Sequence, residues 1–234
     1  NDAHLRSLRR IPAPSTPGAP ASAITPEPPV RIRSLLAVAA ISLAACTTQS
    51  VPPHSAEGAA AATATYFDTT GRTDSLGGGA MAARLGAVSA DHLAKTSAED
   101  IALIGASQTA AVSLPCTPFG LATGEYTPAQ AFLDAGALLA IATDLNPGTA
   151  WCESMQFAIA LACRYLKRTP AQAIAAATIN AAAAIGRAER IGSIEPGKQA
   201  DLLLLEVADY RHLGYRFGGN LVAQVMKRGE FVVF

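Results

Sequence analysis

Ala137-Leu-Leu-Ala-Ile-Ala-Thr-Asp144 runs directly into Leu145-Asn-Pro-Gly148. The seven residues before the aspartate carry no charge, and six of them are apolar. A short apolar run that ends at a turn is typical of a strand buried on both faces. Pro and Gly then interrupt the pattern. The stretch therefore predicts a buried strand that carries a carboxylate, that of Asp144, at its carboxyl end.

Two similar apolar stretches, residues 87–92 and 109–115, come earlier in the chain. Helix starts are predicted by three capping-box patterns, Thr96–Glu99, Thr127–Gln130 and Thr169–Gln172. A further helix is expected over 153–166, and the last of the capped helices should run toward Gly186. Because apolar strands alternate with helices, the sequence predicts an α/β fold of βα units with a parallel sheet. A (β/α)₈ barrel and an open doubly wound sheet both fit.

The last part of the chain, residues 191–234, has a different pattern. Turn-forming residues at 191–198 precede an apolar strand over 200–206. Residues 221–234 then predict two strands joined by a turn at Lys227-Arg-Gly229. We expect this segment to be a small β appendage on the α/β body.

Residues 1–73 are of low complexity, with seven prolines among the first thirty residues. Such a composition cannot bury enough apolar surface to offset chain entropy, so we expect disorder. Within it, residues 31–46 resemble an export signal, because Arg31 and Arg33 precede an apolar run that ends in Leu43-Ala-Ala-Cys46. Cys46 would then be a lipidation site. The alternative is an alanine-rich stretch in a misjoined reading frame.

The overall composition excludes one class of partner. Lys and Arg together balance Asp and Glu at 18 each, and half of the residues are hydrophobic. A neutral chain without a basic block gives no electrostatic reason to bind nucleic acid. The four cysteines show no CxxC spacing, and three of them lie in apolar or helical contexts that predict ordinary reduced thiols.

Two polar residues stand where predicted strands end, and these are the candidate functional residues. Asp144 is placed to bind a metal ion or merely to cap the Asn-Pro-Gly turn. His92, which ends the earlier strand, is a candidate ligand, acid–base group or satisfied core residue. No His-x-His pair occurs in the sequence. In barrels the carboxyl ends of the strands carry the chemistry.

Three stretches together resemble the imidazolonepropionase family of metal-dependent amidohydrolases. They are residues 77–93, residues 142–149, and residues 178–186 with 192–203. The resemblance covers about residues 74–234 and implies the last part of an amidohydrolase-type (β/α)₈ barrel over 74–190. Residues 191–234 would be the β-segment of a composite β-sandwich domain. The family hydrolyses the cyclic amide of 4-imidazolone-5-propanoate to N-formimidoyl-L-glutamate in histidine degradation, with one zinc or iron ion.

The resemblance also implies roles for individual residues. Asp144 matches the family's metal-binding aspartate, which also accepts a proton from the attacking water. His92 matches a histidine that faces the substrate and its reacting carbonyl. Asn146, Gly148 and Thr149 match positions that hold the substrate or product. The implied partner is a small-molecule substrate, and homo-oligomers are left open. The implied location is the cytoplasm, with membrane attachment only if Cys46 is lipidated.

The resemblance to the family ends before residue 74. The family's next metal histidine aligns with Thr69, and the acidic or amide residue of the same motif aligns with Arg72. Neither side chain supplies the expected ligand, and Arg72 would repel a cation. We therefore expect an amidohydrolase by descent that is inactive as this chain alone, from a truncated or fused gene. The alternatives are an exported lipoprotein without enzymatic activity and a misassembled gene product.

Overall fold

The computed structural model describes residues 37–39 and 77–232. The predictions of disorder over 1–73 and of lipidation at Cys46 fall outside these residues, apart from 37–39. Thr69 and Arg72 fall outside them too. The expected boundaries at residues 73 and 190 stay predictions. Within the described part, no helix has the length and apolar character needed to cross a bilayer.

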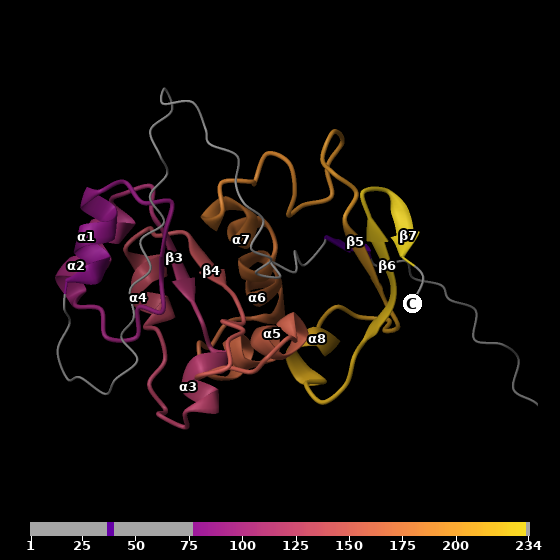
Figure 1. The fold of residues 1–234 in the computed structure, drawn as a ribbon, viewed down its shortest axis with the longest axis horizontal. Helices are drawn as coiled ribbons and strands as arrows, with labels where there is room; N and C mark the ends of the chain where they lie inside the picture. Colours follow the sequence, from indigo (N-terminus) through magenta and orange to yellow (C-terminus); the bar gives the residue numbers. More distant parts are fainter. Residues whose placement is uncertain (1–36, 40–76, 233–234) are drawn as a thin grey trace, which may run out of the picture. The chain divides into compact units, whose positions relative to one another are not determined.

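A three-stranded parallel sheet forms the centre of the α/β part (Figure 1). The strands are β2 (Ser89–Asp91), β3 (Ala110–Ser113) and β4 (Leu139–Ile141), in the order β2-β3-β4. Val112 in the middle strand pairs with Asp91 on one side and Ala140 on the other. The predicted strands and their parallel pairing are therefore confirmed, although each strand is shorter than its apolar run.

Helices follow each of these strands, as the predicted βα units require. The helices of the described residues are α1 (Gly78–Arg84), α2 (Ala98–Gly105), α3 (Cys116–Gly120), α4 (Ala129–Asp134), α5 (Met155–Arg164), α6 (Pro170–Ala177), α7 (Ile179–Ala184) and α8 (His212–Tyr215). The short helices α3 and α8 were not predicted, because five and four residues are too few to show a helical period.

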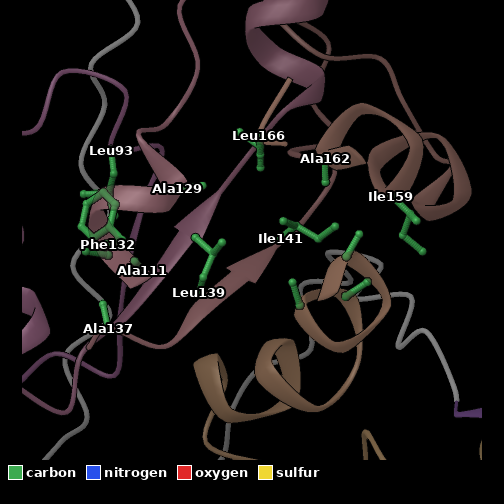
Figure 2. Close-up of a cluster of buried hydrophobic side chains, with 14 of the residues drawn as sticks. Leu93, Ala111, Ala129, Phe132, Ala137, Leu139, Ile141, Ile159, Ala162 and Leu166 are labelled. Carbon is green, nitrogen blue, oxygen red and sulfur yellow. The ribbon is translucent and has the colours of Figure 1, made fainter. Parts of the chain in front are cut away.

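Both faces of the sheet are buried, which explains why β4 and most of β3 are apolar. Leu139 and Ile141 extend from β4 into the main core, where they join Phe132 of α4 and Ile159 of α5 (Figure 2). Ala140, between them, belongs to a smaller cluster on the opposite face. Successive side chains of a strand point to opposite faces, so this division follows from the strand itself.

Two of the three capping-box predictions are wrong in their details. Ser97, not Thr96, caps α2 and accepts a hydrogen bond from the backbone N–H of Asp100. Helix α4 begins without a side-chain cap, and the Thr127 hydroxyl donates to the carbonyl oxygen of His92 at 2.6 Å. The Thr96 hydroxyl likewise donates to the carbonyl oxygen of an earlier residue, Leu93.

The capping box at Thr169 is confirmed at the start of α6. The helix does not continue to Gly186, because it breaks at Thr178 and resumes as α7. The Thr178 hydroxyl donates back to the carbonyl of Ile174 at 2.7 Å, an arrangement that bends helices. Gly192 packs against this break with a φ of 95°, and a Cβ there would lie 2.7 Å from Ala182. The close approach requires glycine at position 192.

The last part of the chain forms an antiparallel sheet in the order β1-β5-β6-β7. Strand β5 (Leu202–Leu205) pairs with β6 (Val222–Lys227), which pairs with β7 (Glu230–Val232) through the predicted turn. Arg228 and Gly229 both have positive φ, as the tight turns of hairpins require. The short strand β1 (Ala37–Ala39) comes from the signal-like stretch and pairs with β5.

Candidate active site

The carboxyl ends of the three parallel strands bring together His92, Thr117 and Asp144. His92 directly follows β2, Thr117 lies in the first turn of α3 after β3, and Asp144 follows β4. Nε2 of His92 lies 3.8 Å from Oδ2 of Asp144. The Thr117 hydroxyl donates a 2.6 Å hydrogen bond to the same oxygen. Parallel strands end at one edge of their sheet, so residues far apart in sequence meet there.

This cluster is partly shielded from water. His92 is 7% exposed and the Asp144 side chain 21% exposed. Electrostatic interactions are stronger in such surroundings than in bulk water. Burial raises the pKa of the neighbouring Asp91 carboxyl, and the Asp144 charge adds to this effect, while His92 and a hydrogen bond from Ser89 oppose it. The charges of His92 and Asp144 therefore both act on the Asp91 carboxyl at this edge.

His92 and Asp144 share an uncommon backbone conformation. Their φ angles are 68° and 56°, in the left-handed region that residues with a Cβ seldom adopt. A neighbouring side chain holds the carbonyl oxygen of each residue. Thr127 donates to that of His92 at 2.6 Å, and Asn146 donates to that of Asp144 at 2.7 Å. Strained backbone of this kind clusters at functional sites, where surrounding contacts stabilise it.

Asn146 organises the turn that follows Asp144. Its Oδ1 accepts hydrogen bonds from the backbone N–H groups of Gly148 and Thr149, at 2.9 and 2.8 Å. Its Nδ2 donates to the Thr149 hydroxyl as well as to the Asp144 carbonyl. The three predicted substrate-binding residues therefore lie together, and their polar groups hold the turn. Whether they also hold a substrate stays a prediction.

An open pocket of about 310 Å³ lies beside the cluster. Its lining residues are His92, Ala94, Lys95, Leu114, Thr117, Pro118, Leu121, Thr123, Glu125 and Thr127. Lys95 and Glu125 form an ion pair on its wall. His92 and Thr117 are common to the pocket and to the contacts of Asp144, so these two side chains connect the carboxylate with the cavity.

The described residues do not fit a complete metal site. A structural or catalytic zinc ion needs three or four protein ligands. Within residues 77–232, no three His, Cys, Asp or Glu side chains gather closely enough to hold an ion. His92 and Asp144 provide two potential donors at 3.8 Å.

The sequence predicted that His92 and Asp144 stand at strand ends, where the structure brings them together. It did not identify Thr117 or Thr127. Thr117 could have been found, because it closely follows the predicted strand 109–115 in the same way that Asp144 follows 137–143. Thr127 offered no such signal, since its sequence pattern is that of a helix cap.

Comparison with known protein families gives one match over most of the chain. The model of the amidohydrolase family matches residues 50–232. The imidazolonepropionase of Herpetosiphon aurantiacus is 55% identical over 157 residues, which is 67% of this chain and 37% of that protein. The imidazolonepropionase of Chloroflexus aggregans is 49% identical over 158 residues, 68% of this chain and 37% of its own length. The chain thus spans just over a third of these relatives.

Solved structures show the same fold. An adenosine deaminase from Xanthomonas campestris with bound zinc has a TM-score of 0.56 and 28% identity, and the match covers 65% of this chain and 39% of that one. An amidohydrolase from a Sargasso Sea sample also has a TM-score of 0.56, at 22% identity, with 67% and 39% covered. The expected partial amidohydrolase-type (β/α) barrel is therefore confirmed for the described residues.

Proposed function

Because this chain belongs to the amidohydrolase family, we propose that it derives from a metal-dependent hydrolase of cyclic amides with the specificity of imidazolonepropionase. The substrate would be 4-imidazolone-5-propanoate and the product N-formimidoyl-L-glutamate. Identities of 45–55% to several imidazolonepropionases support this specificity over other amidohydrolase reactions. The observation that carries the proposal is the contact between His92 and Asp144 at the carboxyl ends of their strands.

We assign a separate task to each residue of the cluster. Asp144, oriented by Thr117, accepts a proton from the water that attacks the amide carbon. His92 lines the pocket and faces the reacting carbonyl, to which an imidazole N–H can donate as negative charge develops on its oxygen. Asn146, Gly148 and Thr149 bind the substrate or product along the turn after β4.

The proposed cofactor is one zinc or iron ion, with Asp144 as a ligand. Bound zinc is named for the adenosine deaminase from Xanthomonas campestris and for an atrazine chlorohydrolase from Arthrobacter aurescens. Since two potential donors cannot hold such an ion alone, the other ligands must come from outside residues 77–232. Because Thr69 stands where the family has its next metal histidine, and no His-x-His pair occurs in the sequence, we propose that the chain by itself has little or no hydrolase activity.

We propose a cytoplasmic location and a small-molecule substrate, and no nucleic-acid partner. Homo-oligomerisation remains open in this proposal. The second candidate, an exported lipoprotein without enzymatic activity, depends on Cys46. Labelling cells with a fatty acid and recovering the label on Cys46 would favour this second candidate.

A chimera tests the proposed reaction directly. Residues 77–234 would replace the corresponding segment of the Herpetosiphon aurantiacus enzyme, which supplies the rest of the barrel. We expect this chimera to bind one metal ion and to convert imidazolone propanoate to N-formimidoylglutamate, and the isolated chain to do neither. Asp144→Asn and His92→Phe in the chimera should abolish turnover. A folded, metal-loaded chimera without hydrolysis would refute the assigned specificity.

A further inference from the structure

Two cysteine thiols lie against each other beside the candidate active site. Sγ of Cys116, the first residue of α3, is 3.4 Å from Sγ of Cys152, in the loop before α5. Both are free cysteines. A disulfide bond is about 2.05 Å long, so the sulfur atoms need to approach by roughly 1.4 Å. Cys152 lies outside any helix or strand, and side-chain rotation with a small loop shift can supply this movement.

The two thiols differ in their access to solvent. Cys116 is 2% exposed, whereas Cys152 is only partly buried. Burial raises the pKa of Cys116, and the neighbouring Cys152 and the charge of Asp144 raise it further. The thiolate is the attacking species in disulfide exchange, and its rate also depends on access. Cys152 is therefore the entry point for a reagent, and Cys116 is the second, resolving thiol.

We propose that Cys116 and Cys152 form a reversible redox site that reacts with a small disulfide, such as glutathione disulfide, and closes to an intramolecular disulfide. This inference stands on the sulfur geometry and does not rest on the proposed hydrolase activity. Disulfides in reducing compartments are typically transient and redox-sensing, which fits a pair of free thiols at hydrogen-bonding distance.

The reaction proceeds in two exchange steps. The Cys152 thiolate attacks one sulfur of glutathione disulfide, so an S–S bond forms to Cys152 and one glutathione thiolate leaves. The first glutathione thiolate takes up the proton that Cys152 lost on ionising. Cys116 then loses its proton and attacks Sγ of Cys152 as the thiolate, the S–S bond between Cys152 and glutathione breaks, and the second departing glutathione takes up the Cys116 proton. Two protein thiols are oxidised to one disulfide, while one glutathione disulfide is reduced to two glutathione thiols.

The disulfide would connect the two segments that build the acid–base cluster. Cys116 directly precedes Thr117, whose hydroxyl binds Asp144. Cys152 follows the turn organised by Asn146, where Asn146 and Ala150 form a β-bridge. Oxidation would thus fix the start of α3 to the loop after β4. A cross-link between Cys116 and Cys152 restricts opening of the chain segment that lies between them.

Cys163 provides a matched control within the described residues. It lies in α5, and burial raises the pKa of its thiol as it does for Cys116. The structure records a sulfur–sulfur contact for Cys116 and Cys152 but none for Cys163 among the described residues. Cys163→Ser should therefore leave the reaction unchanged.

The experiment uses the full chain, reduced, diluted until sedimentation shows a monomer, and then incubated with glutathione disulfide. Remaining thiols are alkylated, and the chain is cleaved after Asp and Glu, because no Lys or Arg lies between Lys95 and Arg164. We expect a peptide pair linked through Cys116 and Cys152 as the main product, reversed by dithiothreitol. Cys116→Ser should accumulate glutathione on Cys152, and Cys152→Ser should leave Cys116 unmodified.

Hydrogen exchange gives a second measurement. Residues 144–152 should exchange at least about 10-fold more slowly in the oxidised chain than in the reduced chain. The proposal is overturned if glutathione stays on Cys152 of the unsubstituted chain without linkage. It is also overturned if linkages through Cys46 or Cys163, or between chains, predominate.

Discussion

The Thr117 hydroxyl donates a 2.6 Å hydrogen bond to Oδ2 of Asp144, and so joins the start of α3 to the loop after β4. Thr117 is buried, and Asp144 holds a strained backbone conformation with a φ of 56°. The bond fixes one oxygen of the carboxylate near Nε2 of His92. Thr117 is thus a positioning residue, because it acts on the reacting groups through Asp144.

Removing this hydroxyl should loosen the segment that carries Asp144. Thr117→Val keeps the side-chain shape but removes the donor, and a hydrogen bond to a charged group contributes about 1.5–3 kcal/mol. Because Asp144 is partly exposed, we expect the lower end of this range, which is about 10-fold faster amide exchange over residues 139–150 when measured in the chimera. Thr117→Ser retains the donor and should exchange at nearly the original rate. Equal rates in the Val and Ser variants would contradict the assigned role.

Substitutions at Asn146 separate its two functions in the turn. Asn146→Ala removes the acceptor for Gly148 and Thr149 and the donor to the Asp144 carbonyl. We expect a loss of roughly 1–2 kcal/mol of local stability, measured as loss of exchange protection at Gly148 and Thr149. Asn146→Asp keeps an acceptor, so those two amides should stay protected, while the donor to Asp144 is lost. Loss of their protection in the Asp variant would show that the acceptor does not hold the turn.

The hairpin turn between β6 and β7 should weaken in acid. Burial acts to raise the pKa of Asp201, but hydrogen bonds from Lys227, Arg228 and Gln199 outweigh it and hold this pKa below its ordinary value of 3.8. A group with a lowered pKa stabilises the folded state above its unfolded pKa, and this stability is lost as pH falls through the folded value. The contribution of Asp201 is therefore complete above about pH 5 and declines below about pH 4.

Hydrogen exchange, corrected for its intrinsic pH dependence, measures this effect at the turn. Protection at Arg228, whose N–H donates to Asp201 at 2.9 Å, should fall as the pH is lowered below 4. Asp201→Asn cannot ionise, so it should lower protection at neutral pH and remove the acid dependence. An Asn variant that retains the same dependence would assign the effect to another group.

The sequence was sufficient to predict the sheet because three apolar runs, each ended by a polar residue or a turn, have few other interpretations. The same apolar runs predicted His92 and Asp144 at strand ends. Neighbouring parallel strands have their carboxyl ends at one edge of the sheet, so the two residues were expected to lie close together. The hydrogen bond from Thr127 to the His92 carbonyl could not be predicted. Residues 92 and 127 are distant in sequence, and a Thr-Pro pattern before a helix carries no information on a tertiary acceptor.

The helix break at Thr178 is a second feature that the local sequence could not predict. Residues 170–184 are rich in alanine, and their intrinsic propensity favours one continuous helix. The break depends on the threonine back-bond to Ile174 and on the close approach of Gly192, which comes from a later segment. Local propensity therefore gave the correct type of element, and tertiary contact decided where it ends.

The three-stranded sheet predicts self-association of the isolated chain. Among the described residues, β2 and β4 each pair on one side only. Unpaired strand edges present N–H and C=O groups to other chains, and a barrel avoids such edges only by closing on itself. Large apolar side chains are also exposed, with Leu85 at 64% and Trp151 at 75%. We expect oligomers, aggregates or a partly molten state.

Equilibrium sedimentation over a range of chain concentrations, with thermal unfolding followed in parallel, measures this association. The apparent mass should rise with concentration, and unfolding should be broad, because side chains that lack packing partners do not melt cooperatively. In the chimera with the Herpetosiphon aurantiacus segment, the added strands would cover both edges, so the same residues should give a sharp transition. A monodisperse monomer of the isolated chain with a sharp, cooperative transition would show that the described fold needs no further strands. His92 and Asp144 would then belong to a complete small site, and not to part of a larger one.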